Sequence, residues 1–448
     1  MKFRKLLLLT ALGVSATGGL YAQEKLTLQQ AVQAALQNNL QIKQARLSEA
    51  ISDENVKLAK TSIYPNLNAS TNLFFNYGRS VDPTSYQYVE QAITTNNLNL
   101  SSNVILSQGR LKFNQISQNK YQLEADKSNT RKVENDLSLL VGTTYLQVLN
   151  NRDLLTAAQQ QLAITRQQLD RAQKLFDVGN STLADLSQAK SQVATAELNE
   201  TNAQNQLDIS YLDLAQLMER DPQSKFEVVS PDVDQMLNLK TDYTATSVYS
   251  QAVENYPDIV LARYNTAVAK KYVDIAKSYY YPTLSLGGAL SSNYSSTGRD
   301  ILTGQPNPHY FDQINQNFYK YWGFTLNIPL FNNLQTRIGV NKAKLTYQRT
   351  EAAEQLARNN FNKVINQAIV DLKAAQKQYY STQSAYNSKK DAFTVIQQRF
   401  NVGLVNSLDF NQSQTDLNTA EFNFIQAKYM FIFRSKVIDF YLGNTISF

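Results

Sequence analysis

A long stretch without proline, residues 111–176, constrains the fold of this chain more than any other feature. Within it a large apolar side chain recurs at every seventh position, at Val141, Val148, Leu155, Leu162, Leu169 and Phe176. Small or polar residues fill most of the column three positions further on, and the remaining faces are largely polar or charged. This repeat predicts a helix whose narrow seam packs against partner helices. Such a helix would be about 100 Å long, far longer than a compact domain is wide.

The same pattern occurs a second time after a shift of 224 residues without a gap. The shifted column is again large and apolar or aromatic, at Ile365, Leu372, Tyr379, Tyr386, Phe393 and Phe400. Residues 176–185 and 400–409 both carry a Val-Gly pair that is followed by an aspartate. Upstream, residues 59–67 match residues 276–284 around a Tyr-Pro pair. The chain is therefore a tandem duplication, with one unit in each half.

The first 22 residues have the layout of a secretory signal peptide, because three cations precede an apolar run and small residues that end at Ala22. We therefore expect an exported protein. Removing Lys2, Arg4 and Lys5 lowers the formal charge from +6 to +3, so the basic balance is weak evidence for nucleic acid, and no nucleic-acid partner is expected. The chain has no cysteine, which excludes disulfides and a lipid-modified N-terminal cysteine.

Four segments alternate apolar with small polar side chains, at residues 67–77, 98–106, 284–294 and 322–330. Each is about as long as a tilted strand that crosses a bilayer, and none has a charge on its apolar face. Aromatic residues crowd the strand ends, as at membrane interfaces. The strands alone also fit an ordinary soluble sandwich. The export signal, the duplication and the aromatic ends together favour the membrane.

An open sheet of four strands cannot persist in lipid, because the polar groups of its edge strands would have no partners. Copies of the chain must therefore join. Two copies would form an eight-stranded barrel filled by side chains, whereas three copies would form twelve strands around a lumen. We expect a homotrimer embedded in membrane lipid.

The predicted organisation follows from these patterns. A first repeat (23–219) and a second repeat (247–442) flank a linker (220–246), and a tail (443–448) ends the chain. Two Pro-containing pairs in the linker break the helical pattern, and we expect a small collar there. Each repeat contains a leading helix, a hairpin, a long helix and a return helix, in that order. In the first repeat these elements are predicted at 27–62, 67–106, 111–176 and 183–218. In the second repeat they are predicted at 247–278, 284–330, 335–400 and 407–441.

This order of elements, the repeated Val-Gly turn with its aspartate, and the strand end at residues 328–331 (Ile-Pro-Leu-Phe) resemble the TolC-like outer-membrane efflux family over essentially the whole mature chain. The resemblance implies a mainly α fold with a membrane β-part: a tandem-duplicated long-helix coiled-coil tunnel, with four strands per chain in a trimeric twelve-stranded β-barrel. It implies an outer-membrane exit channel of a tripartite efflux or type I secretion system. Such a channel is a passive conduit from a periplasmic adaptor and an inner-membrane transporter to the exterior.

The resemblance also implies a periplasmic gate of acidic residues just after the turns, at Asp185 and Asp409. Three copies would place six carboxylates around one axis, enough to attract cations and repel anions. Alternatively, each aspartate only favours the first turn of its return helix.

The chain departs from the family's polar latch, because Phe400, Val405 and Gln412 stand where the better-known pattern has Tyr, Arg and a second Asp. We therefore expect packing of Phe400 and Phe176 to hold the entrance.

The turns themselves are candidates for adaptor docking, at Val178, Gly179, Val402 and Gly403. Glycine permits a tight turn and a close backbone approach. It also commonly ends a helix without any further role.

Neither an enzyme nor a cofactor or metal site is expected. The chain has no GxxxxGK[ST] loop and no cysteine, and its single histidine, His309, lies in a long loop beside Pro308. Two alternatives are a general outer-membrane porin, which has no need of such long helices, and a surface coiled-coil scaffold, which does not explain the strands.

Overall fold

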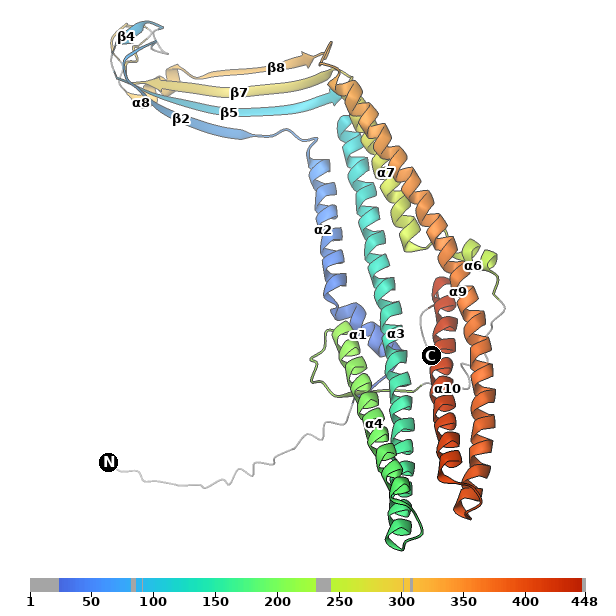
Figure 1. The fold of residues 1–448 in the computed structure, drawn as a ribbon. Coiled ribbons are helices and arrows are strands. Elements are labelled where there is room, and N and C mark those ends of the chain that lie inside the picture. Colours follow the sequence, from blue (N-terminus) through green and yellow to red (C-terminus); the bar gives the residue numbers. More distant parts are fainter. Residues whose placement is uncertain are drawn as a thin grey trace, which may run out of the picture.

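The structure, a computed structural model, describes residues 24–81, 86–90, 92–230, 243–300, 302–306 and 309–444. The expected signal peptide lies outside these residues, as do linker residues 231–242 and tail residues 445–448. A four-stranded sheet projects from one end of a long bundle of helices, and two tight turns lie at the opposite end (Figure 1).

Strands from both repeats form one antiparallel sheet in the order β2-β5-β7-β8. These strands are β2 (Asn68–Asn76), β5 (Ile93–Gln108), β7 (Thr283–Ser295) and β8 (Tyr319–Asn327). The two predicted hairpins are β2-β5 and β7-β8, and β5 pairs with β7 to join the repeats. In this single copy β2 and β8 are the outer strands, so each is paired along one side only.

The register brings the apolar positions of all four strands onto one face. Leu100 of β5 lies opposite both Ala69 of β2 and Leu290 of β7, and Leu286 of β7 lies opposite Phe324 of β8. Directly opposed residues lie on the same face of a sheet, and side chains alternate between faces along a strand. The other face collects Asn, Ser, Thr and Gly, and Ser291 Oγ donates a hydrogen bond to Asn99 Oδ1 at 2.7 Å. The sheet therefore has one apolar and one polar face.

The last strand differs from its predicted range, because β8 begins at Tyr319 and ends at Asn327 instead of spanning 322–330. Pro329 has no N–H group with which to continue the ladder. The shift includes Lys320, which lies opposite Leu290 and so on the apolar face. The expectation that no strand carries a charge on that face is therefore wrong for β8.

Two structured pieces lie in the loops beyond the sheet. A small hairpin of β3 (Arg79–Val81) and β4 (Tyr88–Glu90) follows β2, and the short helix α8 (Tyr310–Gln316) precedes β8.

Two helices of 67 residues each dominate the rest of the chain, α3 (Leu111–Asp177) and α9 (Gln335–Asn401). Return helices follow them, α4 (Leu183–Leu217) after α3 and α10 (Ser407–Tyr441) after α9. Most of the predicted seven-residue columns are buried in the bundle, including Val141, Val148, Leu155, Leu162, Ile365, Leu372, Tyr379 and Phe393.

Each leading helix is broken in two, where the sequence predicts one continuous helix. The first consists of α1 (Leu28–Asn38) and α2 (Leu40–Thr61), and the second of α6 (Ala245–Ala252) and α7 (Pro257–Ser278). Asn39 has an extended backbone, its Oδ1 accepts a hydrogen bond from Gln41 N at 2.9 Å, and its Nδ2 donates to Leu217 O at 3.3 Å. Proline takes the first position of α7, where its missing N–H group is tolerated.

A collar forms where the segment before α1 meets the segment after α4. There β1 (Glu24–Leu26) pairs in parallel with β6 (Phe226–Val228). The Tyr145 hydroxyl lies beneath them, 2.8 Å from Leu26 O and 2.7 Å from Val229 O. Burial disfavours the phenolate and raises the pKa of Tyr145 to about 12. This hydroxyl therefore ties the long helix α3 to the collar.

Within the part of the chain that the structure describes, no helix has both the length and the apolar character needed to cross a membrane.

Candidate functional site

The two turns that carry the predicted site residues lie together at the end of the bundle far from the sheet (Figure 1). Gly179 and Gly403 have φ angles of +79° and +78°, in the left-handed region that favours glycine. Each donates its N–H to the phenylalanine three residues earlier, Gly179 to Phe176 O at 2.9 Å and Gly403 to Phe400 O at 3.1 Å. The next residue, Asn180 or Leu404, bonds a carbonyl five residues back. This is the Schellman ending of a helix, and backbone conformation accounts for both glycines.

The tips of both turns expose apolar side chains. Val178 is 68% exposed and Val402 is 71% exposed. A Cβ atom added at Gly179 or Gly403 would meet no atom within 4 Å. The four candidate docking residues therefore form small apolar tips with free space around the backbone.

Asp185 serves as part of an N-terminal cap. Its Oδ2 accepts hydrogen bonds from Thr182 Oγ1 at 2.7 Å and Thr182 N at 3.1 Å, and Thr182 Oγ1 accepts from Asp185 N. Its Oδ1 accepts from Ser407 Oγ at 3.3 Å, which joins the two turns. The hydrogen bond from the Thr182 side chain, followed by that from the Thr182 backbone, lowers the pKa of Asp185. The Asp185 carboxylate therefore already accepts hydrogen bonds from residues of both turns.

Asp409 has the equivalent position but a different environment. Its backbone N donates to Oδ1 of Asn406, the N-cap of α10, at 2.8 Å. Its side chain is exposed, and the carboxylate makes no hydrogen bond or ion pair with any described residue. Of the two predicted gate carboxylates, Asp409 is therefore the one whose oxygens bond no described residue.

The two phenylalanines of the predicted entrance are not in ring contact with each other among the described residues. Phe400 stacks on Phe410 of α10, with ring centroids 4.4 Å apart and an interplanar angle of 26°, and Phe410 is buried. Phe176 ends its helix partly exposed. The aromatic packing therefore holds α9 to α10 within one coiled coil.

A link between the two coiled coils comes from Arg171 of α3, which no pattern in the sequence singles out. Its Nη1 donates to Asn401 Oδ1 at 2.9 Å, and its Nη2 lies 3.3 Å from both Phe400 O and Asn401 O. The guanidinium also lies over the Phe400 ring, 4.9 Å from its centroid. The last carbonyls of a helix lack intrahelical donors and carry partial negative charge, so a cation there is favourable.

One turn further into the bundle, Gln168 Nε2 donates to Gln414 Oε1 at 3.1 Å, from α3 to α10. Gln414 is buried, and its Nε2 has no hydrogen-bond partner among the described residues. Both connections depend on α3 lying beside α9 and α10, and the heptad column that defines α3 contains neither Arg171 nor Gln168.

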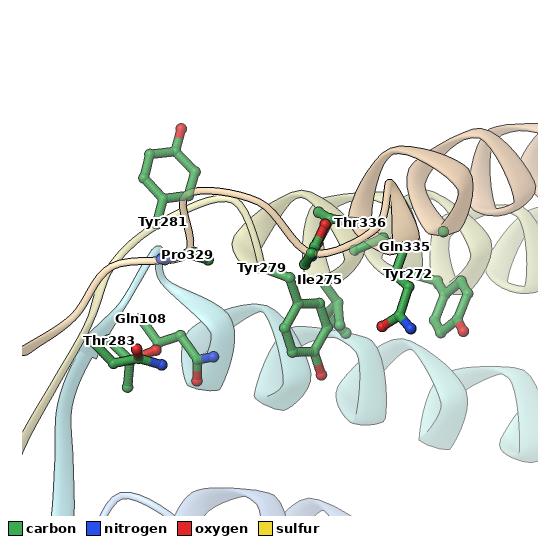
Figure 2. A pocket seen from close by; sticks show the side chains of 13 residues that line it. Gln108, Tyr272, Ile275, Tyr279, Tyr281, Thr283, Pro329, Gln335 and Thr336 are labelled. Carbon is green, nitrogen blue, oxygen red and sulfur yellow. The ribbon is translucent and has the colours of Figure 1, made fainter.

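A second feature is a cavity of about 470 Å³ where the sheet meets the helices (Figure 2). Its lining includes Tyr272, Tyr279, Gln108, Gln335 and Thr336 and contains no charged side chain. Tyr281 points away from Tyr279 in Figure 2, and it packs so closely on Gly109 that an added Cβ would lie 2.5 Å from its ring. The cavity is therefore polar but uncharged.

Among the described residues, no group of three or more His, Cys, Asp or Glu side chains could hold a metal ion. His309 precedes α8 as its N-cap residue.

Comparison with known proteins identifies the family to which this fold belongs. The family model described as "Outer membrane efflux protein" matches residues 31–219 and 248–444. The outer membrane efflux protein BepC of Brucella suis is 22% identical, over 90% of this chain and 82% of that protein. The outer membrane protein TolC of Salmonella enteritidis is 23% identical, over 99% of this chain and 87% of that protein.

Solved structures have the same fold at low identity. CusC matches with a TM-score of 0.79 and 16% identity over 93% of this chain and 92% of its own. The outer membrane protein VceC of Vibrio cholerae matches with a TM-score of 0.74 and 16% identity over 94% of this chain and 96% of its own. These matches confirm the predicted TolC-like fold. The chain belongs to the outer membrane efflux protein family, and it is an outer-membrane efflux channel whose helical part extends into the periplasm.

Proposed function

We propose that three copies of this chain close into a ring and form a passive conduit that receives its cargo from a periplasmic adaptor and an inner-membrane transporter. The observation that carries this proposal is that a single copy leaves surfaces without partners in both the sheet and the helices. Both edges of the sheet are unpaired, and the helices that continue from them expose apolar stripes.

The sheet supplies the first argument. β2 and β8 each leave one row of backbone N–H and C=O groups without partners in a single copy. In lipid each unpaired group costs several kcal/mol, so β2 of one copy pairs with β8 of the next. Such a head-to-tail contact uses two different surfaces and closes as a ring. Twelve strands are the smallest multiple of four that leaves a lumen.

The helices connected to the two edge strands also have surfaces without partners. An exposed apolar stripe runs along α2, and the first half of α9 carries another. The stripes comprise Leu40, Leu47, Ile51 and Leu58 on α2, and Ile338, Leu345 and Leu356 on α9. α2 continues from β2, and α9 continues from β8, so the contact that pairs the strands also brings these stripes together (Figure 1).

The polar face of the sheet then lines the lumen, and the apolar face meets lipid. Family members are efflux channels, and energy comes from the transporter partner. A lining of uncharged Asn, Ser, Thr and Gly side chains suits an unselective passage.

The turns form the inner entrance. Three Asp409 carboxylates provide the exposed part of the gate, and three Asp185 carboxylates contribute charge while they cap α4. Phe400 keeps the α9–α10 turn rigid through Phe410, and Phe176 lies at the matching end of α3. The adaptor docks on the apolar tips formed by Val178, Gly179, Val402 and Gly403.

Membrane fractionation followed by electrophoresis with and without heating tests the assembly. We expect a trimer band in the outer-membrane fraction that heating converts to monomer, whereas a soluble monomer would refute the ring.

Docking has its own test because the chain contains no cysteine, so Val402→Cys creates a single reactive site. We expect this cysteine to cross-link to a co-expressed adaptor, while Asn315→Cys, at an exposed position of α8 beyond the sheet, does not. Equal cross-linking from both positions would count against docking at the turns.

A further inference from the structure

An apolar groove of about 540 Å³ lies between α8 and the sheet, at the end of the strands away from the helical bundle. Its apolar lining consists of Ala69, Leu98, Leu100, Leu290, Ile314 and Phe318. We propose that this groove binds one acyl chain of a membrane phospholipid with a net negative charge, with Lys320 contacting the phosphate. The inference depends on the placement in the outer membrane and not on the adaptor or the transporter.

The groove exists because α8 is fastened to the apolar face of the sheet. Ser292 Oγ donates to Ile314 O at 2.6 Å, and the Tyr310 hydroxyl donates to Asn96 Oδ1 at 2.6 Å. Gln313 is 1% exposed, and its side chain bonds both backbone groups of Ser295, with N to Oε1 at 2.9 Å and Nε2 to O at 2.8 Å. These bonds satisfy the polar groups beside the groove and fix its wall.

The register shows on which face the groove lies. Ser292 is opposite Leu98, and Leu290 is opposite Leu100, so these residues share the apolar face. That face continues toward the helices through Leu286 and Phe324. Because the apolar face of an outer-membrane strand meets lipid, the groove opens to the acyl chains of the bilayer.

A positive charge lies beside the groove. Lys320 is directly opposite Leu290 in the β7–β8 ladder, and it is exposed. It forms no ion pair within the described residues. The nearest acidic residue along the chain in α8 is Asp312, which is also exposed and lies about 200° around the helix from Ile314. A lysine at the end of a membrane strand extends toward the headgroups, where phosphate is its natural partner.

A lipid fits the groove better than a second copy of the chain. A neighbouring copy pairs with the backbone edges of β2 and β8, which lie in the plane of the sheet. The groove instead opens on the face, and its floor includes β5 and β7, the two central strands.

The test uses the trimer in lipid bilayer discs that contain phosphatidylglycerol or phosphatidylcholine with a photoreactive acyl chain, with labelled peptides mapped by mass spectrometry. We expect labelling to concentrate on peptides that contain Leu98 and Ile314. Leu290→Trp fills the groove and should lower this labelling about tenfold, equivalent to ~1.4 kcal/mol. Leu286→Trp, on the same face outside the groove, should leave it unchanged. Lys320→Ala should remove a preference of about fivefold for phosphatidylglycerol.

Even labelling along the whole apolar face, or labelling unaffected by Leu290→Trp, would overturn the site. Equal labelling by the two lipids would overturn the role of Lys320. Groove peptides that stay unlabelled in an intact trimer would show that a neighbouring copy fills the groove. The trimer band is measured first, so a failure of assembly is seen separately from a failure of lipid binding. If Leu290→Trp does not assemble, Lys320→Ala still tests the proposed lipid site, because it should remove the preference for phosphatidylglycerol.

Discussion

The guanidinium of Arg171 lies 2.9 Å from the side-chain oxygen of Asn401 and connects the end of α3 to the end of α9. These residues are 230 positions apart and belong to different repeats. The link ties the α3–α4 coiled coil to the α9–α10 coiled coil at the end of the bundle far from the sheet. We expect this link to help keep the proposed entrance closed.

Arg171→Ala should loosen the entrance, because it removes hydrogen bonds that together contribute about 1–2 kcal/mol at this partly exposed site. We expect the ratio of open to closed channels in planar bilayers to rise by about fivefold or more. Arg166→Ala is the matched control, since Arg166 pairs with Glu197 at 2.9 Å within the α3–α4 coiled coil. An unchanged open fraction in Arg171→Ala would exclude this link as the closing contact.

Asp409→Asn should weaken cation preference more than Asp185→Asn does. The Asp409 carboxylate is free, whereas Asp185 is surrounded by hydrogen-bond donors. Losing three charges at a constriction should lower the cation-to-anion permeability ratio about fivefold, equivalent to ~1 kcal/mol of attraction. Reversal potentials in a salt gradient measure this ratio, and the same ratio in wild type and Asp409→Asn would remove Asp409 from the gate.

The start of α4 should lose protection in acid. Hydrogen bonds, first of all from the Thr182 side chain, lower the folded-state pKa of Asp185 below the ordinary value of 3.8. A lowered pKa means that the carboxylate stabilises the cap above the unfolded-state pKa, and that this stability is lost as pH falls through the folded-state pKa. Hydrogen exchange of the first turn of α4, corrected for intrinsic rates, should accelerate only in that acidic range. In Asp185→Asn this acid-dependent acceleration of hydrogen exchange should be absent. If the variant shows an acceleration of the same size as wild type, a group other than Asp185 causes it.

Tyr145→Phe should destabilise the collar by about 1–3 kcal/mol, because the carbonyl oxygens of Leu26 and Val229 lose the hydroxyl that they share, and the bond to Leu26 O is buried. Tyr145 is 1% exposed, so water cannot replace the hydroxyl. Hydrogen exchange of the peptides that contain Leu26 and Val229 should accelerate. Tyr121→Phe is the control, since that tyrosine is 37% exposed and substitution keeps its ring contact with Tyr264. Equal effects of both substitutions would argue against a special role for the Tyr145 hydroxyl.

Ile51→Glu should weaken the proposed trimer, because Ile51 is 63% exposed in one copy and lies in the α2 stripe that we propose packs against the next copy. Burying isoleucine contributes about 1.5–3 kcal/mol per contact, and a buried unpaired carboxylate adds a penalty. The trimer band should dissociate at a lower temperature than in wild type. Ala50→Glu places the same charge on an exposed neighbouring position, about 100° around the helix, and should have little effect. Dissociation of both variants at the wild-type temperature would place the subunit contact elsewhere.

Repetition makes most of the fold predictable from the amino-acid sequence. The column from Val141 to Phe176 predicts a long helix, because a heptad pattern is a property of consecutive residues. Alternation in residues 284–294 likewise separates an apolar from a polar strand face. The turns at Gly179 and Gly403 are recognisable because they occur twice in the same context.

Boundaries and local breaks are harder to predict. The break at Asn39 interrupts a stretch of good helix formers, and its stability depends partly on the bond from Asn39 Nδ2 to Leu217 O, 178 residues away. The start of β8 at Tyr319 depends on pairing with Ser291 of β7.

The duplication, the long helices, the two-faced strands and the positions of the turns can all be predicted from the sequence, because each follows from the spacing of neighbouring side chains along the chain. The pairing of β5 with β7, the position of α8 on the apolar face and the contact of Arg171 with the end of α9 are known only from the folded structure. Those relationships join segments that lie in different elements, and often in different repeats. They depend on how rigid helices and strands are placed side by side, which no local pattern encodes.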